Sequence, residues 1–229
     1  MPDERVLLIT GASTGIGAAT ARRAVDGGWN VVVSARSEDR LQDLVAELGE
    51  ERAFAKRCDV TEFDQQEELV AAALDRFGRI DAAFANAGFG AKRGFLEESP
   101  EQWRSMVDTN VLGVAYTIRA VLPHFRERNS GHFLLTSSVA GRRALPGSLY
   151  SATKWAVCGM GEALRQELFE TDIKTTLIDP GMVDTPFFDN RPSGALTDED
   201  IARIVLFALS QPPHVDLNEV LVRPIHQPL

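Results

Sequence analysis

The sequence predicts an α/β fold: a doubly wound parallel sheet of about seven strands between two layers of helices, a three-layer α/β/α sandwich. Two observations carry this prediction. Short apolar or β-branched runs recur along the chain, and each is followed by a longer stretch with helical periodicity and charges on its outer face. Apolar runs without alternation are typical of parallel strands that are buried on both faces. The rhythm of strand and helix is therefore βαβ.

Seven runs are predicted as strands, and the stretches between them as helices. The strands are residues 6–9, 31–33, 53–55, 82–85, 132–135, 175–178 and 219–223. The helical stretches include residues 37–48, 61–77, 100–128 and 198–209. A stretch that contains Pro and Gly follows the sixth strand, at the sheet edge where ligands bind in open α/β sheets. We therefore expect a substrate lid within about residues 182–196.

Composition limits the protein class. A chain of 229 residues suits one large domain, residues 1–229, better than two. The 44% hydrophobic and 25% charged residues are typical of soluble globular proteins. No signal-type segment and no run near ~18 apolar residues is present, so we expect a cytoplasmic protein with no membrane partner. The net charge of −9 and the lack of a long basic run disfavour a nucleic-acid partner.

Neither cysteine nor histidine is arranged for a cross-link or a metal. Cys58 and Cys158 are far apart in the sequence and form no Cys-x-x-Cys motif, which favours reduced thiols. No two of the four histidines are spaced to share a helical face. We expect no metal site.

A glycine-rich turn follows the first strand. Gly11, Gly15 and Gly17 permit a tight turn and close backbone approach to a phosphate, and the helix that begins there can hold the pyrophosphate of a dinucleotide. Such a turn can also join a strand to a helix without binding anything. The turn alone does not decide between these interpretations.

Tyr150 and Lys154 are four residues apart, so they share one face of a helix. An ammonium beside a phenol lowers the phenol pKa, and a phenol tuned in this way can exchange protons with an alcohol or a carbonyl. A half-buried tyrosine beside a solvated lysine is the structural alternative. A catalytic role for the pair is favoured by an ordered series of motifs that fall at strand ends or on adjoining helices. These are residues 86–88, Asn110, residues 137–138 and residues 180–181.

The ordered set resembles the short-chain dehydrogenase/reductase family over about residues 6–185. The resemblance implies a Rossmann-type fold and an oxidoreductase. It implies that Tyr150 is the acid/base, that Lys154 lowers its pKa and binds the nicotinamide ribose, and that Ser138 holds and polarises the substrate oxygen. Asn110 would anchor a water that links Lys154 to solvent. Asn110 as a kink or packing residue, and Ser138 as a loop donor, remain alternatives.

The choice of serine rests on the motif. The loop between Ser138 and Tyr150 is about one residue shorter than is usual in the family. Counting back from Tyr150 selects Ser137, whereas alignment of the motif at residues 137–141 selects Ser138. We choose Ser138 because the motif fixes the end of the strand.

The second strand ends in Ala35 and Arg36 without an acidic residue. A guanidinium can pair with a 2′-phosphate, and the pattern resembles NADP-preferring members, so NADP is expected and NAD is less favoured. An ordinary surface arginine is the alternative, as is a helix cap for Asp59. The resemblance also implies hydride transfer from the pro-S face. The other implied cofactor contacts are Gly11, Ser13, Thr14, Gly15, Ile16, Gly17, Asp59, Val60, Asn86, Ala87, Gly88, Tyr150, Lys154, Pro180, Gly181, Val183 and Thr185.

The expected reaction is reversible hydride transfer between NADPH and a carbonyl or secondary alcohol. The substrate would contact Ser138, Tyr150, Phe89, Leu145, Met182, Phe187 and Phe188. A 3-hydroxy acid is the alternative substrate class, because Arg142, Arg143 and Lys92 could bind a carboxylate. The C-terminal residues 222–228 also faintly resemble family members that oxidise 3-hydroxy acids.

A non-catalytic NADPH-binding sensor is an alternative to an enzyme. Such a sensor would not need a proton relay, so the presence of Asn110, Ser138, Tyr150 and Lys154 argues against it. Epimerases and dehydratases with the same Tyr/Lys pair need a larger substrate domain than the residues after Gly181 provide. The resemblance implies association through the helices at residues 100–128 and 148–171, and we expect a homotetramer, with a dimer second.

Overall fold

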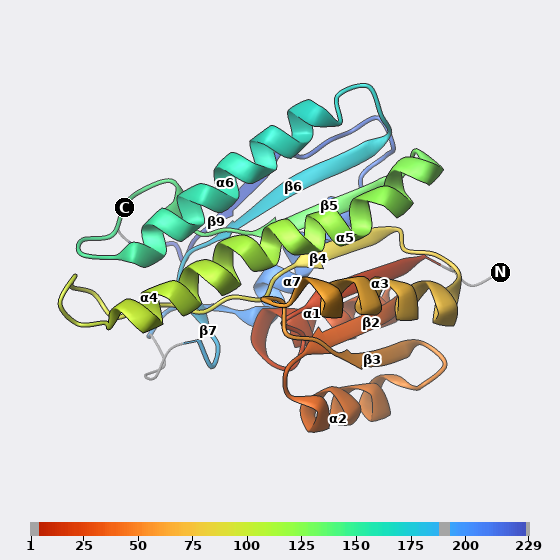
Figure 1. Ribbon diagram of the computed structural model, residues 1–229, viewed down its shortest axis with the longest axis horizontal. Coiled ribbons are helices and arrows are strands. Elements are labelled where there is room, and N and C mark those ends of the chain that lie inside the picture. The colour runs from red at the N-terminus through yellow and green to blue at the C-terminus, as the bar shows by residue number, and fades with distance from the viewer. Residues whose placement is uncertain (1–4, 188–192, 228–229) are drawn as a thin grey trace.

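The computed structural model describes residues 5–187 and 193–227. Seven parallel strands form one sheet in the order β3-β2-β1-β4-β5-β6-β9, with helices on both faces (Figure 1). The predicted doubly wound α/β fold is confirmed. The sheet strands are β1 (Val6–Thr10), β2 (Asn30–Ala35), β3 (Ala53–Arg57), β4 (Ala82–Ala85), β5 (Gly131–Thr136), β6 (Ile173–Pro180) and β9 (Glu219–Val222).

Alternate residues of each central strand enter two separate hydrophobic cores. In β1, Leu7 and Ile9 face one core, while Val6 and Leu8 face the other. The first core packs against α1 (Gly15–Asp26), α2 (Glu38–Leu48) and α7 (Asp198–Leu209). The second packs against α3 (Phe63–Phe77), α5 (Gly113–Arg128) and α6 (Leu149–Glu167), which cover the face turned to the viewer in Figure 1. Burial on both faces explains why the strands read as continuous apolar runs.

The predicted helix at residues 100–128 is interrupted. It consists of α4 (Pro100–Val107), a π-helical turn (Asp108–Leu112) and α5. Ser99 caps α4 by accepting a hydrogen bond from the Gln102 amide at 3.2 Å, and Pro100 occupies the first turn. A π turn inserts one extra residue into the helix, and such turns are frequent at functional sites. Here it carries Asn110 to the interior, where that side chain is fully buried.

Two short strands, β7 (Val183–Asp184) and β8 (Leu196–Thr197), pair beside the sheet. They bracket most of the segment expected to form a lid. Residues 188–192, with Phe188, lie outside the described residues, so movement of a lid stays a prediction. Thr197 starts α7 with a reciprocal capping box to Asp200. Within the described ranges, no helix combines the length and apolarity needed to cross a membrane.

Candidate active site

A cleft of about 1290 Å³ lies beyond the carboxyl ends of the strands. The volume exceeds the ~300–1,000 Å³ that is usual for a small-molecule pocket. The last residues of β2, β5 and β6 line it, together with the segments that follow β1 and β4 and the start of α6. The described residues predicted to touch the cofactor or the carbonyl substrate all line this cleft except Gly17. Of the predicted catalytic residues, only Asn110 does not line it.

The glycine turn brings two segments of backbone together. Gly11 adopts a φ of +67°, and a Cβ there would lie 2.7 Å from the Cα of Ala87. A Cβ on Gly17 would lie 2.4 Å from the carbonyl oxygen of Gly11. Gly17 therefore permits close packing of α1 on the turn, while Gly11 and Gly15 line the cleft. Thr14 makes no side-chain cap hydrogen bond to α1, and the first turn of α1 has no acidic residue.

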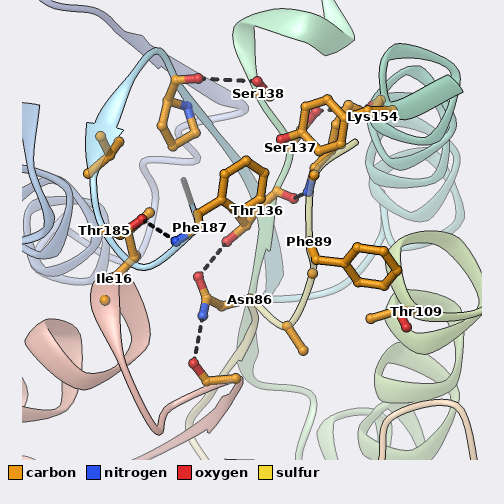
Figure 2. A pocket seen from close by; sticks show the side chains of 18 of the residues that line it. Ile16, Asn86, Phe89, Thr109, Thr136, Ser137, Ser138, Lys154, Thr185 and Phe187 are labelled. Carbon is orange, nitrogen blue, oxygen red and sulfur yellow. Dashed lines mark hydrogen bonds between the residues drawn. The ribbon is translucent and has the colours of Figure 1, made fainter. Parts of the chain in front are cut away.

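Asn86 ties the glycine turn to the centre of the sheet. Its side-chain amide donates hydrogen bonds to the carbonyl oxygens of Thr10 and Gly11, at 3.1 and 3.3 Å. Its side-chain oxygen accepts a hydrogen bond from the hydroxyl of Thr136 at 3.2 Å (Figure 2). The Thr10 hydroxyl in turn accepts hydrogen bonds from the amides of Asn86 and Ala87. Asn86 thus bridges β1 and β5 across the end of β4.

Lys154 is buried, with 4% of its surface exposed. Its Nζ donates a hydrogen bond to the carbonyl oxygen of Thr136 at 2.8 Å and lies 5.6 Å from the centroid of the Tyr150 ring. Burial lowers the pKa of the Lys154 ammonium to about 8, although the charges of Asp179 and Cys158 act in the opposite direction.

The expected lowering of the Tyr150 pKa is not what the structure gives. Burial raises the pKa of the Tyr150 phenol to about 12; a hydrogen bond with Ser138 opposes this shift, and the charge of Asp179 adds to it. The spacing of Tyr150 and Lys154 was interpreted correctly, but desolvation of the phenol outweighs the favourable interactions. In this arrangement the phenol is held in its protonated form.

The two candidate serines have different surroundings. Ser138 lines the cleft, lies near enough to Tyr150 to lower its pKa, and donates a hydrogen bond to the carbonyl oxygen of Pro180 at 3.3 Å. The Ser137 hydroxyl donates to the carbonyl oxygen of Lys154 at 3.0 Å and lies 3.1 Å from the Cys158 sulfur. The motif-based choice of Ser138 therefore fits the geometry better than the count from Tyr150.

Asn110 lies behind the cleft wall. Its side-chain oxygen accepts a hydrogen bond from the Phe89 amide at 3.0 Å. Its amide group donates to the Phe89 carbonyl at 2.9 Å and to the Thr153 hydroxyl at 3.2 Å. These bonds fix the segment that carries Phe89 against α6. The π turn and this bonding agree with the kink-or-packing alternative for the Asn110 side chain.

Phe187 covers the reacting end of the cleft. Its ring lies 5.8 Å from that of Tyr150 at an interplanar angle of 64°, an edge-to-face arrangement. Its backbone amide donates a hydrogen bond to the Thr185 hydroxyl oxygen at 3.4 Å (Figure 2). Phe89, Leu145 and Met182 line the same cleft. The predicted apolar substrate contacts are therefore brought together.

The opposite end of the cleft is basic. Arg36 lines it as predicted, and Arg40, one helical turn further on, lines it as well. Neither arginine forms a salt bridge with another described residue. Asp59 also lines the cleft, but one of its oxygens accepts hydrogen bonds from the amide and hydroxyl of Thr61, at 3.1 and 2.9 Å. The helix-entry interpretation of Asp59 therefore accounts for part of its bonding.

The structure corrects two of the three residues expected to bind a substrate carboxylate. The Arg142 guanidinium donates two hydrogen bonds to Glu219, at 2.7 and 2.6 Å, so its charge is already paired. Lys92 does not line the cleft. Arg143 does line it, as do Arg93 and Arg223, which the sequence argument did not single out.

The sequence analysis did not identify several other residues of the site. The Thr136 carbonyl holds Lys154, and Gln227 accepts a hydrogen bond from the Met182 amide at 2.8 Å. Asp179, directly before Pro180, is a buried carboxyl. Arg40 had a usable signal, because it follows Arg36 at helical spacing. Gln227 and Thr136 had none, because their contacts depend on tertiary packing.

Comparisons with known proteins place the chain in a family. The family model for short chain dehydrogenases matches residues 5–195. An uncharacterized oxidoreductase of Staphylococcus haemolyticus is 42% identical over 225 residues, covering 96% of this chain and 97% of the relative.

Solved structures agree with the sequence match. Serine dehydrogenase from Escherichia coli superposes with a TM-score of 0.90 at 34% identity, over 98% of this chain and 100% of the other. An alcohol dehydrogenase from Thermococcus sibiricus, complexed with 5-hydroxy-NADP, gives 0.91 at 32% identity, over 98% of both chains. A 3-ketoacyl-(acyl-carrier-protein) reductase from Brucella melitensis, at 30% identity, is complexed with NADH and gives 0.89 over 98% and 99%. Structural neighbours thus bind either cofactor, and this chain belongs to the short-chain dehydrogenase/reductase family of oxidoreductases.

Proposed function

We propose that this protein catalyses reversible hydride transfer between NADPH and a carbonyl or secondary alcohol substrate. The observation that carries the proposal is the meeting of Tyr150, Ser138 and Lys154 at one end of the cleft. At that end Lys154 is held by the Thr136 carbonyl, and Ser138 lines the cleft with Tyr150, near enough to lower the phenol pKa. A phenol beside a fixed hydroxyl and an ammonium is suited to proton transfer at a substrate oxygen.

The residues of the cleft fit a dinucleotide. The uncapped start of α1 offers backbone amides to a pyrophosphate, and the glycine turn has no side chain to block its approach. Lys154 would hold the nicotinamide ribose, and the loop from Pro180 to Thr185 the carboxamide. When bound, the cofactor supplies the hydride. The adenine end would be held beside Asp59 and Val60.

The site residues supply the proton and the charge stabilisation. Tyr150 protonates the carbonyl oxygen as the carbon beside it is reduced, and it accepts that proton in the reverse direction. The raised pKa keeps Tyr150 protonated near neutral pH, which is the form that reduction needs. Ser138 stabilises the negative charge that develops on the substrate oxygen. Phe187 covers Tyr150 and limits the access of water.

The preference for NADP is inferred from charge. Arg36 and Arg40 line the cleft at the end of β2, where an adenosine 2′-phosphate would lie, and neither has a carboxylate partner among the described residues. Arg36→Ala should weaken NADPH binding by about tenfold or more and leave NADH binding nearly unchanged. Arg40→Ala should do the same to a smaller extent. Equal losses for both cofactors in a fluorescence titration would reject the preference.

A 3-hydroxy acid is the second candidate substrate. Arg93, Arg143 and Arg223 line the cleft, and none of them forms a salt bridge within the described part of the chain. The similarity to a serine dehydrogenase points the same way. The test compares kcat/KM for a hydroxy acid and its neutral methyl ester, with Arg143→Gln and Arg223→Gln as variants. A carboxylate site requires a preference for the acid that a variant removes; equal rates for acid and ester would dismiss it.

Association through the long helices is also proposed. Val107, Leu112 and Trp155 are large apolar side chains of α4, the π turn and α6, and 37–49% of each is exposed. We infer a homotetramer, with a dimer second. Light scattering that reports the mass of one 25.1 kDa chain would reject both assemblies.

The deciding experiment is NADPH oxidation with a panel of ketones, aldehydes, diketones and 3-oxo acids, followed by its absorbance. NADH is run in parallel, and Tyr150→Phe is the control. Turnover that prefers NADPH and disappears in the control is the expected result. If the full panel gave no turnover while NADPH still bound tightly, the sensor alternative would replace the enzymatic proposal.

A further inference from the structure

A second ionisable centre lies directly behind the reacting residues. Asp179 belongs to β6 and is 0% exposed. By distance and angle, neither of its carboxylate oxygens has a hydrogen-bond partner among the described residues, although Glu219 and Ser137 lie near enough to affect its pKa. Arg142 Nε lies 3.6 Å from Oδ2, beyond hydrogen-bond distance but within ion-pair range. A buried carboxylate without donors is costly, so its presence calls for a physical explanation.

The neighbouring cation is already neutralised. Arg142 donates two hydrogen bonds to Glu219, at 2.7 and 2.6 Å, so one positive charge faces two carboxyl groups. Glu219 comes from β9 and Arg142 from the turn after residues 139–141. Asp179 directly precedes Pro180, whose carbonyl oxygen accepts a hydrogen bond from Ser138, and the adjacent Ser137 hydroxyl donates to the Lys154 carbonyl of α6. Across this short link the charge of Asp179 acts on Tyr150, Lys154 and Cys158 of α6. When Asp179 is ionised, the group of Asp179, Glu219 and Arg142 carries one net negative charge.

That negative charge acts on both reacting groups in the same direction. It raises the pKa of Tyr150 and also that of Lys154, because a nearby negative charge favours the protonated form of each. Burial and the facing Glu219 raise the pKa of Asp179 itself to about 7, so the charge is present above neutral pH. Carbonyl reduction begins from the phenol, and alcohol oxidation begins from the phenolate.

We propose that Asp179 is a positioning residue that acts through Tyr150 and Lys154. Its buried charge holds both groups in their protonated forms, extends carbonyl reduction to higher pH, and delays alcohol oxidation to higher pH. The inference rests on the proposed oxidoreductase function of this site. Asp179 does not touch the substrate, yet its charge would favour carbonyl reduction over alcohol oxidation.

The first test is the pH dependence of both directions in Asp179→Asn, which removes the charge and keeps the shape. The alkaline limb of kcat/KM for carbonyl reduction should move to lower pH by about half a unit or more, and the acid limb of alcohol oxidation should move the same way. Glu162→Gln, an exposed carboxylate of α6 paired with Arg165, is the matched control and should move neither limb. A purely structural role for Asp179 would lower the rate by one factor at every pH. If the limbs of the two pH profiles stay in place in Asp179→Asn, or move to higher pH, the proposal is overturned.

The second test does not depend on turnover. The chain has only two tyrosines, Tyr116 and Tyr150, so a Tyr116→Phe background leaves Tyr150 as the sole source of tyrosinate absorbance. Absorbance read within milliseconds of a pH jump reports the folded protein. Asp179→Asn should ionise at lower pH than the background. If the Asn variant is unstable, both measurements are made on Asp179→Ser, which removes the same charge.

The outcomes separate the two proposals. An unshifted Tyr150 titration in an enzyme that turns over NADPH overturns the role of Asp179 alone. A shifted titration in a protein without NADPH turnover supports the electrostatic coupling but overturns the oxidoreductase function, and with it the consequence for direction. Shifts in both measurements support both proposals.

Discussion

The two ends of the cleft are built in different ways. At the adenosine end, small residues let backbone approach backbone, and Asn86 satisfies the carbonyls of Thr10 and Gly11. At the catalytic end, charges are buried: Lys154 is 4% exposed and Asp179 is 0% exposed. At the adenosine end, close packing fixes the position of the backbone. At the catalytic end, burial of charged groups lowers stability but shifts the pKa values of the groups that transfer protons. Substitutions at the two ends should therefore separate stability from activity.

The largest effect should come from Lys154→Met. Loss of the ammonium should lower kcat by about 10³-fold, within the ~10²–10⁴-fold range of acid/base assistance. Thermal stability should not fall, because Met fills the buried space without the cost of a desolvated charge. Steady-state kinetics and calorimetry on the same preparation test both parts. Loss of stability together with activity would show that Lys154 is mainly structural and would break the comparison.

The two adjacent serines should behave differently. Ser138→Ala should lower kcat by about 10–100-fold, because the substrate oxygen loses a donor. Ser137→Ala should reduce stability by about 1 kcal/mol through its lost bond to the Lys154 carbonyl, with a smaller effect on kcat. Equal kinetic losses in the two variants would contradict the assignment of Ser138.

At the adenosine end, Gly17→Ala should lower stability by about 1–3 kcal/mol, because its Cβ would lie 2.4 Å from the Gly11 carbonyl oxygen. NADPH binding should weaken as the turn shifts. Gly159→Ala is the matched control: that glycine lies within α6 and a Cβ there meets no atom within 4 Å. The control should be neutral or stabilising by up to ~1 kcal/mol in denaturant titrations. An unaffected Gly17 variant would refute the packing account.

The smallest effect is a pH dependence of stability from Lys154. Its pKa is about 8 in the folded protein against an ordinary 10.5, so the unfolded chain binds more protons between these values. Stability from this group is present above pH 10.5 and is lost as pH falls through 8. Relative to Lys154→Met, the wild type should gain about 1.5 kcal/mol between pH 8 and 9.5. Parallel stability curves for the two proteins would contradict the buried charge.

The sequence predicted the sheet well, because strands buried on both faces are apolar throughout. The ends of the strands were predicted less well. For β6, the apolar pattern indicated residues 175–178, whereas the strand is Ile173–Pro180. Lys174 and Asp179 interrupt the apolar pattern, yet both belong to the ladder. The π turn at residues 108–112 was indicated only by the kink alternative for Asn110, because helical periodicity continues on both sides of it.

The same limit applies to the site. Motif spacing identified Tyr150, Lys154 and the glycine turn, because those contacts are local or lie at strand ends. The raised pKa of Tyr150 could not be predicted, since it depends on burial of the phenol in the folded chain and on the charge of Asp179, which belongs to another element. The pairing of Arg142 with Glu219 joins positions far apart in the sequence. Desolvation and long-range ion pairing, which motif spacing does not reveal, account for these two errors.

The chemistry of the two cysteines has a practical consequence. Both thiols are free and buried, and burial raises the pKa of each, that of Cys58 to about 11. Thiolate is the reactive form, so both should resist maleimides at neutral pH. A single cysteine placed at the exposed position Ser193 would then take up a fluorophore alone, in the native background. Such a reporter would lie within the segment expected to act as a lid and could follow its response to NADPH in real time.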